Sequence, residues 1–199
     1  TNYIIVSEEM LEDVQGLTSY IMARLPEKIK NKEDLEILTH ATYGILPLAT
    51  AYVDTLADSK VQRIDVLVAA LTQAKVAEYS PTAILLNPAD AKLMKLTKDD
   101  NGQYIFPWVF MNGGVVVDSI PVIESTAMTS GSFLVGDFKL GAQIFDRRQM
   151  TIEFSNTNED NFVKGMVTVR GSERIAIAVY RPNAFVYGTF ASALAKGSA

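Results

Sequence analysis

Residues 141–188 read GAQIFDRRQMTIEFSNTNEDNFVKGMVTVRGSERIAIAVYRPNAFVYG, and their pattern decides the fold class. Apolar and polar residues alternate over 150–155, which predicts a strand with one face on a core and the other in water. A polar run at 156–161 interrupts the alternation, and β-rich composition resumes over 162–169. The two segments therefore predict a hairpin with a long polar tip. The apolar run 175–179 does not alternate and predicts a strand covered on both faces.

Two amphipathic helices are predicted upstream of this hairpin. Apolar residues recur at three- and four-residue spacing over 7–29, where Ser7 is a good N-cap. Pro26 lies inside that stretch and lacks a backbone N–H, so a kink or break is expected there. The second helix is predicted over 60–79, preceded by the capping residues Asp58 and Ser59.

The middle of the chain alternates short helical and extended segments. Asn87 and Pro88 form a cap and a first helical position, which predicts a helix over 89–96. Turns are expected at 99–102 and 112–114, and extended segments at 82–86, 104–110, 115–117 and 120–123. Helices followed by a β-rich second half predict an α+β fold, and no internal repeat is visible.

Composition is that of a globular protein with no unusual chemistry. The 199 residues are 48% hydrophobic and 21% charged, and the formal net charge is -5. This balance argues against a basic nucleic-acid-binding surface of the usual kind. The chain has no cysteine, which excludes disulfides and thiolate chemistry, and neither a signal peptide nor a membrane-spanning segment is seen.

Catalytic and metal sites find little support in the sequence. His40 is the single histidine, and no nucleophile elbow lies near it, so a surface or interface role is expected. Residues 99–102, DDNG, resemble a calcium loop but lack the alternating ligands and the closing glutamate. No catalytic residue, metal or cofactor is therefore predicted.

Charged residues near the hairpin are the remaining candidates. Arg147 and Arg148 follow Asp146 and could bind phosphate, but an ion-pair cluster at the start of a strand is the interpretation we favour. Glu173 and Arg174 are further charged residues of the same region.

Four segments carry a resemblance to a known family. They read ILLNPADAKLMKLTKDDNGQYIF (84–106), IFDRRQMTIEFS (144–155), EDNFVKGMVTV (159–169) and ERIAIAVYRPNAFVYGTF (173–190). In this order, and over most of the chain from Ser7 to Phe190, they resemble the major capsid protein of tailed bacteriophages, of the Hong Kong 97 type. No single motif identifies the family; the resemblance rests on the four segments occurring in the same order along the chain.

The resemblance implies two discontinuous domains within an α+β fold. A peripheral, or P, domain would comprise 1–60 and 142–175, with a spine helix and the long hairpin. An axial, or A, domain would comprise 61–141 and 176–199. The hairpin is expected to pack against the first helix and not against the second.

The resemblance also implies an N-terminal arm and an extended hairpin, the E loop, ahead of the spine helix. Residues 1–6 look like the returning end of that hairpin only, and the chain begins without methionine. The N-arm and most of the E loop are therefore expected to be absent. Such a core should fold but form monomers or small oligomers and not a native shell.

The function implied is structural, with no enzymatic activity. Copies of the chain would form hexamers and pentamers of an icosahedral phage or prophage shell around double-stranded DNA, with scaffold and portal proteins as further partners. No membrane, cofactor or small-molecule substrate is implied, and the protein would be found in the virion and, during assembly, in the host cytoplasm. The expected subunit-interface residues are Arg147, Arg148, Asn158, Glu159, Asp160, Glu173 and Arg174.

Two alternatives stay open at this point. An encapsulin-type shell that packages a protein cargo shares the fold. An α+β hydrolase would need a catalytic constellation around His40, and the sequence shows none.

One covalent reaction of the family can be compared residue by residue. In some members an asparagine of the P-domain hairpin is joined to a lysine of a neighbouring subunit, assisted by a glutamate. Gly165 and Ser172 stand at the positions that resemble these two groups. Glycine has no side-chain amide and serine is a poor general base, so this crosslink is not expected.

Overall fold

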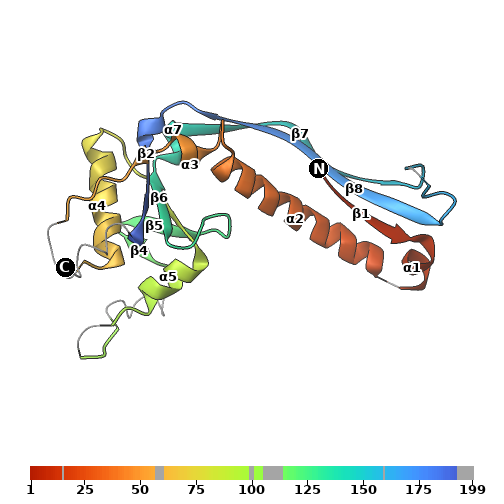
Figure 1. Ribbon diagram of the computed structural model, residues 1–199, viewed down its shortest axis with the longest axis horizontal. Helices are drawn as coiled ribbons and strands as arrows, with labels where there is room; N and C mark the ends of the chain where they lie inside the picture. Colours follow the sequence, from red (N-terminus) through yellow and green to blue (C-terminus); the bar gives the residue numbers. More distant parts are fainter. Residues whose placement is uncertain (15, 57–60, 99–100, 105–113, 159, 192–199) are drawn as a thin grey trace. The chain divides into compact units, whose positions relative to one another are not determined.

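The computed structural model describes residues 1–14, 16–56, 61–98, 101–104, 114–158 and 160–191. It comprises two compact units (Figure 1). Unit 1 consists of Thr1–Asp34 and Ile144–Ala176, and unit 2 of Leu35–Gln143 and Ile177–Ala199. Residues 35–56, which the sequence interpretation grouped with the hairpin, belong to unit 2.

Unit 1 is a three-stranded sheet with a long helix packed on it. The strand order is β1 (Asn2–Ser7), β8 (Met166–Val179), β7 (Ala142–Ser155), and β1 runs antiparallel to β8. The helix α2 (Leu17–Thr39) lies alongside the hairpin of β7 and β8 (Figure 1). The apolar cluster between them contains Ile21, Leu25 and Ile29 of α2, Val169 of β8, and Met150 and Ile152 of β7. The prediction that the hairpin packs against the first helix is confirmed.

The first helical segment is divided at a different place from the one expected. Instead of one helix over 7–29 that breaks at Pro26, α1 (Glu8–Asp13) ends near Gly16 and α2 runs unbroken through Pro26. Gly16 has a φ of 93°, a conformation that glycine adopts without steric cost. Because Pro26 has no N–H, the Met22 carbonyl lacks its usual hydrogen bond within the helix, but Met22 is exposed, so water can supply a donor. The cap was predicted correctly, because Ser7 Oγ accepts from the Met10 N–H at 3.3 Å.

The two hairpin strands are longer than predicted. β7 begins at Ala142, and β8 runs unbroken from Met166 to Val179, merging segments that were predicted separately. Residues 162–165 lie in a turn and not in the strand. The expectation that 175–179 is covered on both faces is also wrong, since Ala176 is exposed. β1 pairs with β8 only up to Gly171, so the later part of β8 lacks that neighbour.

Unit 2 is built on a mixed six-stranded sheet. Its order is β2 (Thr50–Ala51), β9 (Phe185–Thr189), β6 (Ser132–Gly136), β3 (Ala83–Leu86), β5 (Ile120–Glu124), β4 (Val116–Val117). The β3–β5 and β2–β9 pairs are parallel, and the other pairs are antiparallel. Shorter helices complete the unit: α3 (Ile45–Leu48), α5 (Pro88–Lys95), α7 (Phe138–Gly141) and the 3-10 helix η1 (Pro182–Ala184).

Helix α4 (Arg63–Val76) covers this sheet with its apolar face. Val66, Leu67 and Leu71 are fully buried in the same cluster as Phe133 of β6. The helix is shorter than the predicted 60–79, and its N-cap is Gln62, whose N–H donates to Asp65 at 2.8 Å. Asp58 and Ser59, the predicted caps, lie outside the described residues.

The β3–α5 connection agrees with its sequence interpretation. Asn87 Oδ1 accepts from the Ala89 N–H at 3.0 Å, as expected of the cap before α5. The extended segments at 82–86, 115–117 and 120–123 correspond to β3, β4 and β5. The turn at 112–114 and the strand at 104–110 lie almost wholly outside the described residues. No described helix is long and apolar enough to cross a bilayer.

Candidate assembly surface of the long hairpin

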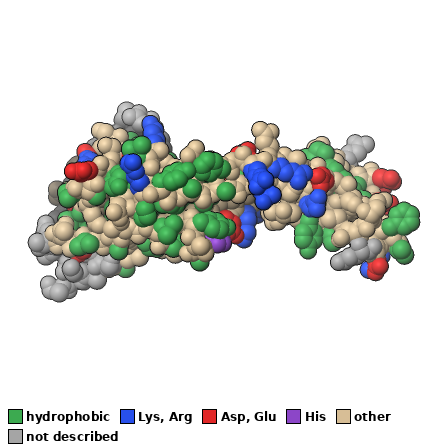
Figure 2. Space-filling view, turned by 90° about the horizontal axis from the view of Figure 1, so that it is seen from above, with side chains coloured by type: hydrophobic (Ala, Val, Ile, Leu, Met, Phe, Trp, Pro, Cys, Tyr) green, Lys and Arg blue, Asp and Glu red, His purple; other side chains and the backbone are tan. Residues whose placement is uncertain are grey.

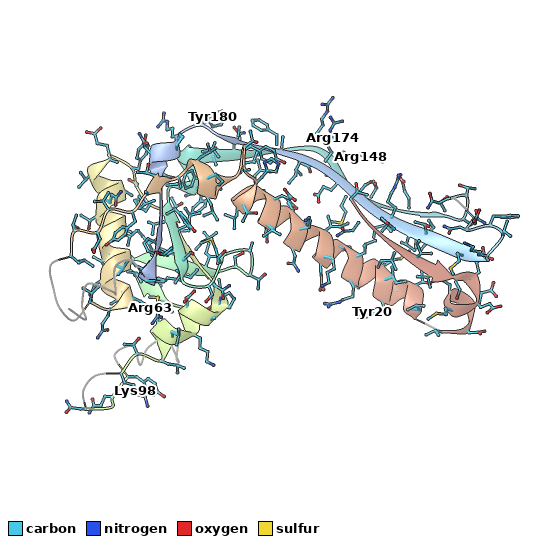
Figure 3. The ribbon with its side chains drawn as sticks, in the orientation of Figure 1. Tyr20, Arg63, Lys98, Arg148, Arg174 and Tyr180 are labelled. Atoms are coloured by element: carbon cyan, nitrogen blue, oxygen red, sulfur yellow. The ribbon has the colours of Figure 1, made fainter. Side chains whose placement is uncertain are left out.

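The predicted interface residues all belong to unit 1. Arg147 and Arg148 lie on β7, Asn158 and Asp160 lie in the tip, defined here as residues 156–165, and Glu173 and Arg174 lie on β8. Glu159 falls outside the described residues. In Figure 3, Arg174 projects from the hairpin on the side away from α2, with Arg148 close by. Basic side chains gather over the hairpin in the view of Figure 2.

An ion-pair group forms on this sheet around a residue that the sequence interpretation did not single out. Glu153 of β7 accepts a hydrogen bond from Arg170 of β8 at 2.5 Å and from Arg148 at 3.4 Å. The hydrogen bond from Arg170, together with its charge, lowers the pKa of the Glu153 carboxyl. All three side chains are about half exposed, so the pairs add little to stability.

Arg147, Arg148, Glu173 and Arg174 were expected to pair between subunits, and that stays a prediction, since the structure holds one chain. Glu173 and Arg174 are consecutive on a strand, so their side chains leave on opposite faces of the sheet. Glu173 interacts electrostatically with Glu33 of α2, whereas Arg174 is exposed. Among the described residues, Arg147 and Arg174 have no ion-pair partner. The hairpin therefore carries two cationic groups, Arg147 and Arg174, that no described residue neutralises.

Carboxylates crowd the opposite side of the same sheet. Burial is the main cause that raises the pKa of the Glu33 carboxyl, followed by the charges of Glu173, Asp34 and Asp146, while Lys30 acts in the opposite direction. One oxygen of Glu173 is buried without a hydrogen-bond partner. No group of three described carboxylate or histidine residues is arranged to hold a metal ion.

Replacing Glu33 with glutamine is expected to raise the melting temperature at pH 7. The folded chain retains the Glu33 proton to a higher pH than the unfolded chain, so stability falls as pH rises above 4.5, the ordinary pKa. The increase in melting temperature should disappear below pH 4.5, where Glu33 is protonated in both the folded and the unfolded chain. Thermal melts of Glu33→Gln and of Glu12→Gln, an exposed site on α1, at pH 4 and pH 7 measure this. A gain that is equal at the two pH values would contradict it.

Gly165 and Ser172 offer neither group that the family's crosslink needs. Gly165 has a φ of 62°, its carbonyl accepts from the Glu8 N–H at 2.9 Å, and a Cβ added there would meet nothing within 4 Å. The Ser172 hydroxyl lies 3.2 Å from the Thr151 hydroxyl. Gly165 directly precedes β8 and Ser172 lies seven residues further along, about 23 Å at the rise of a strand, so the two positions lie far apart within one chain.

Asn161 is an important residue of the tip that the sequence interpretation missed. It is 7% exposed, and its Nδ2 donates to Thr168 Oγ1 at 2.6 Å. Next to it, Phe162 and Val163 are 77% and 87% exposed. The polar run was predicted over 156–161, and Thr157, Asn158 and Asp160 are indeed exposed. Asn161 is buried instead, and the apolar residues Phe162 and Val163 that follow it face solvent. No local pattern signals this arrangement.

A groove of about 680 Å³ lies beside the tip within unit 1. Tyr3, Glu153 and Arg170 lie on one face of the sheet and line the groove, and Phe154 also borders it. The other lining residues are Ser155, Thr157, Asn158 and Thr168. Such a volume is in the range that encloses an organic group of moderate size.

His40 is not arranged as a catalytic base. Its ring stacks on Tyr43 with centroids 3.5 Å apart, and its Nδ1 accepts from the Thr42 N–H at 3.2 Å. In a Ser-His-Asp triad this nitrogen carries a proton and donates to a carboxylate. The observed contact therefore opposes the hydrolase alternative.

Comparison with known proteins points to one family. A family model described as the phage capsid family matches residues 1–190. The major capsid protein of Enterobacteria phage HK97 is 35% identical over 198 residues, covering 96% of this chain and 51% of that protein. The chain thus spans about half the length of this relative.

Solved structures share the fold at low sequence identity. A chain from Gordonia phage Cozz has a TM-score of 0.76 at 17% identity, covering 94% of this chain and 68% of that one. A holo-encapsulin complex from Synechococcus elongatus has a TM-score of 0.64 at 15% identity, with coverage of 94% and 71%. The α+β fold of the Hong Kong 97 type that the resemblance implied is confirmed.

Proposed function

This chain belongs to the phage capsid family, and from that membership we propose that it is the major capsid subunit of a tailed phage or prophage, whose copies build an icosahedral shell around double-stranded DNA. The observation that carries the proposal is the 35% identity, over 96% of this chain, to the HK97 major capsid protein. The family is structural, and the proposal includes no enzymatic role.

We assign unit 1 to the P domain and unit 2 to the A domain. The support is the composition of unit 1, in which the long helix α2 packs on the hairpin of β7 and β8. The A domain would lie near the local symmetry axis of each hexamer or pentamer. Head-to-tail contacts between identical subunits close into such rings.

The charged face of the hairpin is proposed to contact neighbouring subunits. Arg147 and Arg174 are exposed without ion-pair partners among the described residues, so acidic groups of another subunit can neutralise them. Asn158, Glu159 and Asp160 belong to the same proposed interface at the tip. Further partners would be scaffold, portal and DNA, with assembly in the host cytoplasm and the virion as the final location.

Microscopy of particles formed by the complete product of the gene tests this function. Closed particles that contain nuclease-protected DNA are expected. An encapsulin-type shell shares the fold, with a TM-score of 0.64 to the encapsulin complex, but the 35% identity to the HK97 major capsid protein favours the phage subunit. Particles that hold a protein cargo and no protected DNA would support that alternative, and the absence of particles would contradict both.

Shells of this protein are expected to fall apart into monomers in hot detergent. Gly165 and Ser172 provide neither the amide nor the carboxylate for a lysine-asparagine bond. Denaturing gel electrophoresis of boiled particles measures this directly, with shells of a crosslinking relative as the control. A ladder of multimers joined through residues 162–167 would contradict it.

A further inference from the structure

Helix α1 presents one acidic and apolar face to solvent. Leu11 packs against the apolar cluster of unit 1. The opposite side of the helix and its C-cap is called the α1 face here, and it consists of Glu9, Met10, Asp13 and Val14. Met10 and Val14 are 52% and 48% exposed. Both carboxylates are exposed, and neither has an ion-pair partner among the described residues.

The hairpin carries a second exposed face, on which the unpaired charges are positive. The Thr151 and Ser172 hydroxyls meet across the strands at 3.2 Å, so odd-numbered residues of β7 and even-numbered residues of β8 share one face of the sheet. Alternation along the strands adds Phe145, Arg147 and Arg174 to this face, and these three are called the arginine patch. Phe145 is 45% exposed, and Arg174 projects away from α2 (Figure 3). The arginine patch thus combines apolar surface with unpaired positive charge.

The two surfaces of one chain lie too far apart to meet. Helix α1 begins beside the hairpin tip (Figure 1), where the Glu8 N–H donates to the Gly165 carbonyl at 2.9 Å. Arg174 lies nine residues beyond Gly165, about 30 Å at the rise of a strand. This distance is several times the length of an arginine side chain. Only a second copy can therefore bring the carboxylates of α1 to the arginine patch.

We infer that the α1 face of one subunit docks on the arginine patch of a second copy of the chain. Glu9 and Asp13 face Arg147 and Arg174 across the contact, and the apolar residues of the α1 face cover Phe145. Hydrogen bonds between guanidinium and carboxylate groups are strong and directional. The contact joins two different surfaces, so it is head-to-tail and can close a ring. This inference rests on the proposed function and names the acidic partner of the arginines.

The distribution of charge favours α1 as that partner. Four exposed carboxylates lie on this six-residue helix, which carries no basic residue: Glu8, Glu9, Glu12 and Asp13. Asp34 and Asp146 are the other exposed carboxylates of unit 1 without an ion pair. They lie near Glu33 in a group that also includes Lys30, whose charge offsets part of theirs. Complementary charge on the two surfaces steers association and fixes its register.

Zero-length crosslinking tests the contact, since a carbodiimide joins a carboxylate to a lysine amine only where the two touch. Arg147→Lys/Arg174→Lys keeps both charges and supplies the amines. Particles are assembled from isotopically light and heavy copies of the complete product of the gene, treated with the carbodiimide and examined by peptide mass spectrometry. Amide bonds from positions 147 or 174 to Glu9 or Asp13 of a different chain are expected. Adding Glu9→Gln/Asp13→Asn is the control and should abolish them.

Charge reversal measures what the contact contributes to assembly. Arg147→Glu/Arg174→Glu and Glu9→Arg/Asp13→Arg each place like charges in contact, so each should lower the yield of shells at least about tenfold. The chain with all four substitutions restores opposite charges and should recover most of the yield. Asp34→Arg is the matched control at an exposed carboxylate outside the α1 face, and it should not rescue Arg147→Glu/Arg174→Glu. Melting temperatures establish that every variant is folded.

The outcomes separate this inference from the proposed function. Shells that lack the expected amide bonds, or that form normally with reversed charges, would overturn the docking and leave the function standing. Rescue by Asp34→Arg in place of the α1 substitutions would overturn it as well. The expected bonds in oligomers of a product that never forms shells would support the docking and contradict the function. Neither bonds nor shells would contradict both.

Discussion

Replacing Phe185 with alanine is expected to lower the free energy of unfolding by about 3–5 kcal/mol. Phe185 begins β9 and is fully buried in unit 2. Its ring meets Phe138 edge-on with centroids 5.2 Å apart. A Cβ added at Gly141 would lie 2.5 Å from the ring, so the backbone already approaches it as closely as packing permits. Truncation leaves a cavity that these rigid neighbours cannot fill.

Equilibrium unfolding in urea, followed by circular dichroism, measures this loss. Phe162→Ala is the matched control, because the same atoms are removed from a side chain that is 77% exposed. Its free energy of unfolding should change by less than about 0.5 kcal/mol. Equal losses in the two variants would show that Phe185 does not contribute to the core as described.

Leu25→Ala is expected to cost about 2–5 kcal/mol and to loosen the hairpin from α2. Leu25 is 2% exposed, and its side chain packs over Gly171 of β8, where an added Cβ would lie 3.2 Å from it. Since Gly171 has no side chain, nothing on β8 can move into the space. The loss falls on unit 1, which has the smaller set of buried residues.

Hydrogen exchange of the β8 amides, combined with urea unfolding, tests this expectation. Leu35→Ala is the matched control on the same helix, since Leu35 is 39% exposed and should lose far less stability. Faster exchange over Met166–Val179 in Leu25→Ala alone is the expected result. Unchanged exchange there would mean that α2 does not hold the hairpin.

Assembly-surface residues were predicted less well than the fold. Arg147, Arg148 and Arg174 were identified as charged candidates on the hairpin, and the structure places them there. Glu153, which binds two of the arginines on this sheet, was missed, because an ion pair depends on which strand positions lie opposite each other. Register between strands is a long-range property that the residues of one strand do not reveal.

Local signals in the sequence determined two helix caps, most of the helices and short strands, and the α+β class, although the N-cap of α4 is Gln62 and not the expected Asp58 or Ser59. Ser7 and Asn87 cap helices because their side chains reach backbone N–H groups two or three residues away. The collinear order of four segments also identified the family. Neither the capping residues nor the order of the segments depends on contacts between residues far apart in the chain.

Tertiary packing decided what those signals left open. The helix α2 continues through Pro26 because Ile21, Leu25 and Ile29 on both sides of it are buried against the hairpin. Likewise Asn161 turns inward because Thr168 offers a partner, which leaves Phe162 and Val163 outside. In each case burial against residues far along the chain, or a buried polar group's need for a hydrogen bond, outweighs the local preference.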